Sequence, residues 1–261
     1  GVKPMPDLRF SMRFSLGAML APALVMASTA YGGGLGEMNE AEREAFRAEV
    51  KAYLLQNPDV LVEAMNVLQD RQAESEAAGD LKLVTDNADR IFKDGDSWVG
   101  GNPNGDVTVV EFMDYRCGYC RKAYGEIEEL VKSDGNIRLI MKEFPILGAD
   151  SMTSARFAIS VRQLHGDDAY KAAHDALITL RGDPDEAGLT RLAQELKLDP
   201  KPILDNMASD AVTNVIAANH ALADTMQISG TPTFVVDKIM LRGYVPLDGM
   251  RQIVAEQRKD G

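Results

Sequence analysis

Cys117-Gly118-Tyr119-Cys120 holds both cysteines of the 261-residue chain, and the residues around it decide the fold. Residues 107–113 are β-branched and apolar enough for a buried strand, and residues 121–131 place apolar side chains at helical spacing. The sequence therefore predicts a strand, a tight turn and a helix that begins at Cys117. Two thiols one helical turn apart at such a place can form and break a disulfide.

The two cysteines are expected to have different roles. The first turn of a helix leaves backbone N–H groups unpaired and carries the positive end of the helix dipole, which stabilises a thiolate. Cys117 is therefore the expected nucleophile of disulfide exchange, and Cys120, deeper in the helix, is the expected resolving thiol. A purely structural disulfide is the less favoured alternative.

No metal site and no bound cofactor is predicted. Structural zinc needs four ligands, whereas the chain offers two cysteines and three histidines without finger-like spacing. The formal net charge of −12 disfavours binding to nucleic acid. The hydrophobic content of 45% favours a folded core rather than disorder.

The N-terminal residues 1–30 have the pattern of a secretory signal peptide. Three basic residues precede the apolar residues 16–27, and Ser28-Thr29-Ala30 supplies a small-x-small cleavage pattern. The apolar segment is too short for a comfortable transmembrane span. Export to an oxidising space, the bacterial periplasm, is therefore expected.

Residues 31–80 are predicted to form a helical extension. One helix is expected over residues 39–56, broken by Asn57-Pro58, and a second to about Gln72, followed by a polar linker or frayed helix end over residues 74–79. Leucines recur every seven residues at positions 54, 61 and 68. This spacing fits association into a homo-oligomer, a dimer or trimer, but it also fits packing of these helices on their own domain.

The rest of the chain predicts one sheet interrupted by helices. Strands are expected over residues 137–141, 233–236 and 240–242, and helices over residues 154–165, 169–180, 186–196, 203–209, 211–226 and 247–257. The predicted organisation is therefore an α/β domain of residues 81–150 and 227–261, with an inserted helical subdomain at residues 151–226.

Three segments, residues 110–120, 142–148 and 230–234, resemble the DsbA-like family of thioredoxin-fold thiol:disulfide oxidoreductases. The resemblance extends over residues 81–258 in order and spacing. It implies a thioredoxin fold with an inserted helical subdomain, and it implies exchange with cysteine-containing exported proteins. Residues 53–61 resemble the N-terminal extension of the ScsC proteins, the suppressor of copper sensitivity family.

The resemblance also implies roles for individual residues. Pro232 is expected to be a cis-proline facing the cysteines, and Thr231 and Pro232 are expected to contact substrate together with Gly118 and Tyr119. Glu111 is expected to be a buried acid that relays a proton to or from Cys120. The alternatives are an ordinary trans turn at Pro232 and a solvated glutamate at the sheet edge. Lys142 is expected either to balance the charge of Glu111 or to be a surface lysine.

The Gly118-Tyr119 dipeptide carries no cation, and with Thr231 before the proline it is similar to the DsbC-type isomerases. The favoured hypothesis is therefore a periplasmic disulfide isomerase or reductase kept reduced by a membrane thiol donor of the DsbD kind. The alternative is a DsbA-like oxidase recharged by a DsbB-like membrane partner. A copper-handling redox protein and a holdase chaperone using the helical insertion are further alternatives, although the 13 methionines are scattered and fit a core.

Overall fold

The computed structural model describes residues 38–260, so the predicted signal peptide at residues 1–30 lies outside the described residues. The chain divides into two units, Gly1–Glu63 and Ala64–Gly261. Each unit is described by itself below. Among the described residues, no helix combines the length and the apolar character that crossing a membrane requires.

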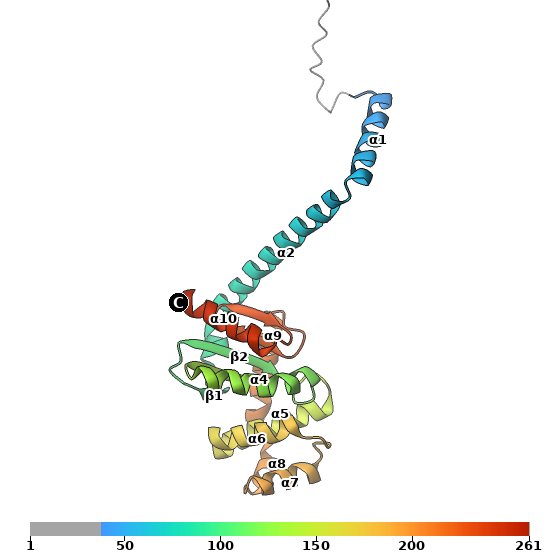
Figure 1. Cartoon of the computed structure of the whole chain (residues 1–261). Coiled ribbons are helices and arrows are strands. Elements are labelled where there is room, and N and C mark those ends of the chain that lie inside the picture. Colours follow the sequence, from blue (N-terminus) through green and yellow to red (C-terminus); the bar gives the residue numbers. More distant parts are fainter. Residues whose placement is uncertain (1–37, 261) are drawn as a thin grey trace, which may run out of the picture. The chain divides into compact units, whose positions relative to one another are not determined.

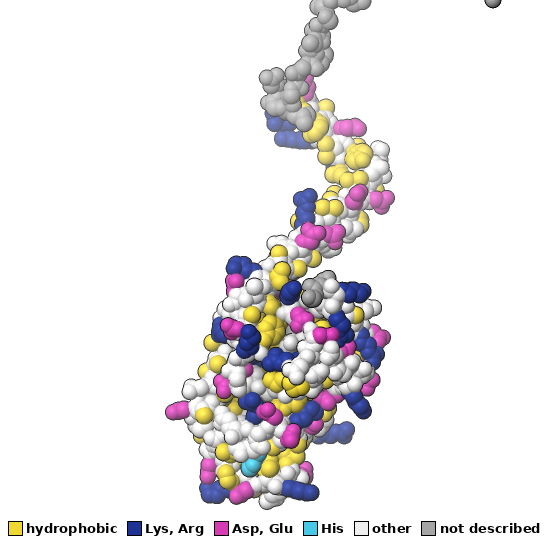
Figure 2. Space-filling view, turned by 90° about the vertical axis from the view of Figure 1, so that its left-hand side faces the viewer, with side chains coloured by type: hydrophobic (Ala, Val, Ile, Leu, Met, Phe, Trp, Pro, Cys, Tyr) yellow, Lys and Arg dark blue, Asp and Glu magenta, His cyan; other side chains and the backbone are white. Residues whose placement is uncertain are grey.

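The described part of the first unit is helical. Helix α1 spans Glu40–Gln56, and the Asn39 side chain caps it by accepting a hydrogen bond from the Glu42 N–H at 3.0 Å. In return, the Glu42 carboxylate accepts one from the Asn39 N–H at 2.9 Å. None of the described α1 residues is buried. Several large apolar side chains of α1 are exposed, namely Phe46, Val50, Tyr53 and Leu55, and Figure 2 shows apolar side chains along these N-terminal helices.

Helix α2 spans Asp59–Asp86 without interruption. The expected polar linker or frayed helix end at residues 74–79 is therefore wrong, because this stretch lies inside the helix. Its alanines and glutamates favour a helix, and the single Gly79 costs only about 1 kcal/mol relative to alanine.

The second unit is built on a five-stranded sheet in the order β1-β3-β2-β4-β5. Strand β2 pairs in parallel with β3, and every other neighbouring pair is antiparallel. The strands are β1 Trp98–Gly101, β2 Val107–Met113, β3 Ile137–Glu143, β4 Thr233–Val236 and β5 Ile239–Arg242. Strand β1 was not predicted, because it is only four residues long and two of them are glycines, which are uncommon inside strands.

Helices cover both faces of the sheet (Figure 1). Helices α4 (Gly118–Asp134) and α10 (Leu247–Asp260) pack on the face that carries Val109 and Met113. Helices α3 (Ala88–Phe92) and α9 (Asp210–Thr225) pack on the opposite face, which carries Val110 and Phe112. The alternation of buried side chains along β2 therefore makes two apolar cores, one on each side of the sheet.

Five helices, α5 to α9, lie between β3 and β4. They are α5 Ala149–His165, α6 Asp167–Thr179, α7 Glu186–Glu195, α8 Pro200–Asn206 and α9 Asp210–Thr225. Figure 1 shows α5 to α8 at one end of the sheet. The α/β fold with a helical insertion and a helical N-terminal extension is confirmed, and the predicted helices begin up to five residues later than the observed ones.

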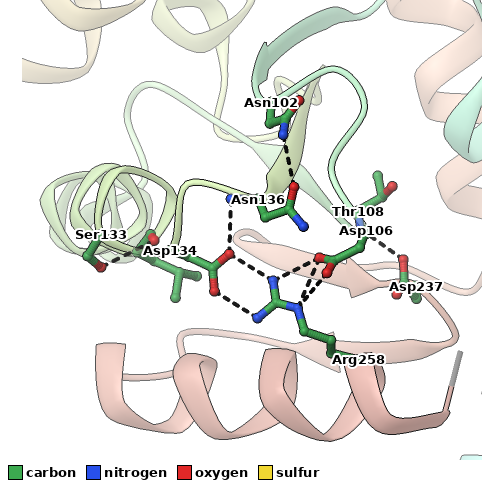
Figure 3. A network of polar contacts seen from close by, with 9 residues as sticks. Asn102, Asp106, Thr108, Ser133, Asp134, Asn136, Asp237 and Arg258 are labelled. Atoms are coloured by element: carbon green, nitrogen blue, oxygen red, sulfur yellow. Dashed lines mark hydrogen bonds and ion pairs between the residues drawn. The ribbon is translucent and has the colours of Figure 1, made fainter.

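An ion-pair network fastens the last helix to the sheet domain (Figure 3). The Arg258 guanidinium donates to both Asp134 carboxylate oxygens at 2.8 and 3.0 Å, and its Nη2 lies 2.9 Å from Oδ1 of Asp106. Asp106 directly precedes β2 and Asp134 ends α4. One side chain of α10 therefore joins the start of the central strand to the end of the helix that begins at Cys117.

Candidate active site

The loop between β2 and α4 is organised by Asp114. Its buried carboxylate accepts three backbone hydrogen bonds, from Arg116 at 2.8 Å, Ile146 at 2.8 Å and Leu147 at 3.0 Å. Its carbonyl accepts the Cys117 N–H at 3.1 Å. Asp114 thus ties the cysteine loop to the loop after β3. This role of Asp114 was not predicted, although an aspartate directly after a strand is a common turn former.

The two cysteines take the predicted positions. Cys117 is the N-cap of α4 and Cys120 lies inside its first turn, with only 1% of its surface exposed. Both are free thiols. Between them, Gly118 and Tyr119 are exposed, and Tyr119 exposes 62% of its surface.

The loop before β4 faces Cys117. The Thr231–Pro232 peptide bond is cis, as the resemblance implies. The sulfur of Cys117 lies 3.1 Å from the Thr231 carbonyl oxygen, to which the thiol form can donate a hydrogen bond. The structure therefore brings together Cys117 and Thr231, residues separated by more than a hundred positions.

The surroundings separate the acidities of the two thiols. A hydrogen bond from the Cys120 thiol lowers the pKa of Cys117 to about 5. The Thr231 side chain and the backbone N–H groups of Tyr119 and Cys120 lower it further, against the opposing effect of burial. The same hydrogen bond, with burial and the nearby Glu111, raises the pKa of Cys120. Cys117 is therefore the thiolate at neutral pH, and Cys120 keeps its proton.

Glu111 lies in the core beneath the cysteines. Burial raises its pKa to about 8, and the negative charge of Cys117 adds to the shift. Glu111, Cys120 and His174 line one cavity of about 10 Å³, which is close to the space that a single water molecule needs. Glu111 is therefore buried, and the alternative of a solvated edge glutamate is wrong.

Lys142 does not face Glu111. In the parallel register Glu111 is opposite Met141, whereas Lys142 is opposite Phe112, on the other face of the sheet. There the fully buried Lys142 ammonium pairs with Asp94 and donates to the Ser97 hydroxyl. Both expected positions of this lysine, beside Glu111 and at the surface, are wrong because strand residues alternate between faces.

A buried polar cluster that was not predicted from the sequence lies behind the site. The Glu143 carboxylate accepts hydrogen bonds from the hydroxyls of Tyr115 at 2.8 Å and Tyr170 at 2.7 Å. The Tyr115 hydroxyl also lies 3.2 Å from Nδ1 of His174. Burial raises the pKa of Glu143 to about 8 and lowers that of His174 to about 4, so both groups are mainly neutral at pH 7. The cluster joins α6 of the insertion to the residue two positions before Cys117.

Within the described residues, no group of three or more His, Cys, Asp or Glu side chains is arranged to hold a metal ion. The reactive groups that the site brings together are its two thiols and the buried carboxyl of Glu111. A stabilised thiolate can attack a disulfide, and a second thiol one turn away can then resolve the mixed disulfide.

Two family models match the chain. The DSBA-like thioredoxin domain matches residues 108–255, and the copper resistance protein ScsC N-terminal domain matches residues 42–74. A thioredoxin-like oxidoreductase from Silicibacter pomeroyi DSS-3 is 42% identical, with a TM-score of 0.62 over 66% of this chain and 97% of its own. BcfH from Salmonella enterica Typhimurium is 28% identical, with a TM-score of 0.69 over 85% of this chain and 97% of its own.

A curated relative is much longer than the matched region. The Na(+)/H(+) antiporter NhaA 1 of Salinispora arenicola is 33% identical over 140 residues, which are 53% of this chain but only 21% of the antiporter. The chain thus spans about a fifth of the length of that relative.

Proposed function

Because the chain belongs to the DSBA-like thioredoxin domain family, we propose that it is a protein thiol:disulfide oxidoreductase, acting as a disulfide isomerase or reductase on exported proteins. The observation that carries the proposal is the position of Cys117 as N-cap of α4, 3.1 Å from the Thr231 carbonyl, with a pKa lowered to about 5. A thiolate at neutral pH is the reactive species in disulfide exchange.

The first step is attack by the Cys117 thiolate on a substrate disulfide. A bond forms between Cys117 and one substrate sulfur, and the other substrate sulfur leaves as a thiolate with the bonding electrons. If a substrate thiolate then attacks the same substrate sulfur, Cys117 is released unchanged and the net result is isomerisation. If Cys120 attacks Cys117, the substrate leaves reduced and the enzyme becomes the disulfide.

Glu111 is the proposed proton acceptor for Cys120 in the second route. The Cys117 charge helps to raise the pKa of Glu111 in the dithiol form. In the mixed disulfide that charge is gone, so the carboxyl ionises more readily at the step where Cys120 must lose its proton. The proton thus moves from Cys120 to Glu111, directly or through a water in the shared cavity.

Gly118, Tyr119, Thr231 and Pro232 are the proposed substrate contacts. Three of them, Gly118, Tyr119 and Thr231, reach the surface around the sulfur of Cys117. In the mixed disulfide, Cys117 carries the substrate sulfur instead of a proton and no longer donates to the Thr231 carbonyl. This carbonyl can then accept a hydrogen bond from a backbone N–H of an extended substrate peptide.

The N-terminal helices are proposed to assemble the chain into a dimer or trimer. The match to the ScsC N-terminal domain and the exposed apolar side chains of α1 support this assignment. Several active sites held around one misfolded chain suit isomerisation, because the enzyme must retain its substrate between steps. Deletion of residues 31–75 should lower the mass in solution to that of one shortened chain, and an unchanged subunit number would contradict the assignment.

We place the reaction in the periplasm, with a DsbD-like membrane protein as electron donor. Two observations support this proposal. In residues 1–30, basic residues are followed by an apolar segment and then by small residues, and the chain belongs to the DSBA-like family. The natural substrates are then cysteine-containing exported proteins.

A DsbA-like oxidase is the second candidate, and the acidity of Cys117 favours it. A low pKa stabilises the dithiol form, which makes the disulfide more oxidising. In this role the pair would be recharged by a DsbB-like membrane partner.

Two parallel assays separate the candidates. The isomerase should restore activity to a protein with scrambled disulfides, and the Cys117→Ala variant should not. Rapid oxidation of a reduced substrate without recovery of the scrambled one would support the oxidase and contradict the isomerase. If the wild-type chain does neither, the proposed exchange activity itself is wrong.

A further inference from the structure

An aromatic pair stands beside the nucleophile. The ring of Tyr119 stacks on Tyr244, with centroids 6.1 Å apart and an angle of 28° between the planes. Tyr119 lies two residues after Cys117 and exposes 62% of its surface, so the pair presents an open aromatic face next to the reactive sulfur.

Tyr244 is fixed from two directions. Its hydroxyl donates to Oε1 of Glu126 at 2.7 Å, and Oε2 of the same carboxylate accepts the Leu247 N–H at 2.8 Å. The Lys122 ammonium lies 4.1 Å from the centre of the Tyr244 ring, and among the described residues no carboxylate forms an ion pair with it. Glu126 and Lys122 both belong to α4, so Tyr244 is held against the helix that Cys117 begins.

The same pair is tied to the cis-proline loop. The Gly243 N–H donates to the Pro232 carbonyl at 2.9 Å. Gly243 has a φ of 109°, a backbone conformation that favours glycine, and this turn brings Tyr244 alongside α4. Gly243 therefore connects the Tyr119–Tyr244 pair to the loop whose Thr231 carbonyl lies 3.1 Å from the sulfur of Cys117.

The bond between Cys117 and the substrate cysteine determines which part of the substrate lies beside Tyr119. In the mixed disulfide the substrate sulfur is bonded to Cys117, and the neighbouring substrate residue has its Cα only about 3.8 Å from that of the substrate cysteine. Its side chain must therefore lie on the rim of the site, and the Tyr119 ring is part of that rim. An open ring face that is already held in place favours a second ring or another flat apolar group.

We propose that the Tyr119–Tyr244 pair, supported by Glu126 and Lys122, is a specificity subsite that favours substrates with an aromatic residue next to the reactive cysteine. This inference rests on the proposed exchange function and names the class of substrate sequence that the site prefers. Tyr119 contacts the substrate directly, and Tyr244 acts as a positioning residue through it.

The test uses the Cys120→Ala chain, in which Cys117 is the single thiol, and peptides joined to glutathione by a disulfide. The Cys117 thiolate attacks the peptide sulfur, and glutathione leaves as its thiolate. The equilibrium constant between the peptide–glutathione disulfide and the peptide–Cys117 disulfide therefore measures the preference for each peptide. The peptides carry Tyr, Ala or Asp next to their cysteine. The tyrosine peptide should be favoured over the alanine peptide by roughly two- to tenfold, the range of one aromatic contact.

Four variants in the same background locate the preference. Tyr119→Ala and Tyr244→Leu should abolish it, whereas Tyr244→Phe, which keeps the ring, should retain most of it. Leu164→Ala, at an exposed position of α5, is the matched control and should leave it unchanged. Thiolate absorbance against pH should show the same Cys117 pKa in the Tyr244 variants, so that a change in preference is not a change in acidity.

Three outcomes would overturn the inference while leaving the proposed function intact. They are exchange without any preference, a preference that survives Tyr244→Leu but is lost in Leu147→Ala, and a stronger preference for the aspartate peptide. Leu147 is the alternative apolar contact for the aromatic residue of the substrate, because its side chain is exposed and its N–H donates to the Asp114 carboxylate. If the wild-type chain exchanges with none of the peptides, the failure lies with the proposed function.

Discussion

Cys117 is the residue whose ionisation the site controls most strongly. Hydrogen bonds, first from Cys120, lower its pKa from 9.0 to about 5. Its alkylation rate should therefore rise with pH around a midpoint near 5, and Cys120→Ala should move that midpoint upward. A midpoint near the ordinary thiol value of about 8.5 in the unsubstituted chain would contradict the described hydrogen bonds.

The same shift has a consequence for stability. Since the folded pKa of Cys117 lies below the unfolded one, the thiolate stabilises the dithiol form fully above about pH 9, and this contribution is lost as pH falls through 5. The disulfide form lacks this contribution. Denaturant unfolding of both forms between pH 9 and 5 should show the dithiol form losing stability relative to the disulfide form.

Glu111 is predicted to control the second chemical step but not the first. Glu111→Gln removes the proton acceptor for Cys120, so resolution of the mixed disulfide by Cys120 should slow by on the order of a hundredfold. The attack of Cys117 should keep its rate, which rapid acid quenching and alkylation can measure separately. Equal slowing of both steps would indicate damage to the site rather than loss of a proton acceptor.

Glu111 is also predicted to lower the stability of the folded protein at high pH. Because burial raises its folded pKa from 4.5 to about 8, the contribution of the neutral carboxyl to stability is fully present below about pH 4.5 and is lost progressively as pH rises to 8. Glu111→Gln should therefore be more stable than the wild-type chain above pH 8, in both redox forms. The charge of Cys117 contributes to the shift, so the gain should be larger in the dithiol form.

At the scale of elements, Lys142 is expected to matter for folding and not for chemistry. It joins β3 to Asp94 in the segment before β1, on the face of the sheet away from the cysteines. Lys142→Met should cost about 2–3 kcal/mol in the free energy of unfolding, below the usual range for buried pairs because Asp94 reaches solvent. The Cys117 pKa should not change, and a change would mean that Lys142 acts on the active site.

Arg258 is predicted to fasten α10 to the rest of the fold. Replacing it by glutamine removes the bidentate pairing with Asp134 and the contact with Asp106, and should lower the melting temperature by about 2–4 °C. Lys201→Gln is the matched control, since its pair with Asp205 is far more exposed. Because Arg258 lowers the pKa values of both aspartates, the difference between Arg258→Gln and wild type should shrink as pH falls below 4.

At the scale of the whole molecule, local patterns predicted most of the fold. Helical periodicity located every helix after residue 107, and the cysteine spacing located the start of α4. Strand β1 was missed because Gly100 and Gly101 form a strand only through pairing with β3. The face of Lys142 depends on strand register, which no local pattern contains.

The site could be predicted only where residues are close in the sequence or where the family resemblance supplied them. Cys117 and Cys120 follow from local spacing, and Thr231 and Pro232 followed from the resemblance. The cluster of Glu143, Tyr115, Tyr170 and His174 assembles from three separate segments, and the Tyr119–Tyr244 pair from two. Such contacts are tertiary, and neither periodicity nor composition records them.

The redox state of the Cys117–Cys120 pair in the living cell tests the central claim most directly. Rapid acid quenching followed by a thiol-specific mass tag distinguishes the dithiol from the disulfide on a gel. An isomerase or reductase supplied by a membrane thiol donor must be mostly in the dithiol form, and loss of that donor should oxidise it. A pair found almost entirely as the disulfide in normally growing cells would contradict the isomerase and establish the oxidase direction instead.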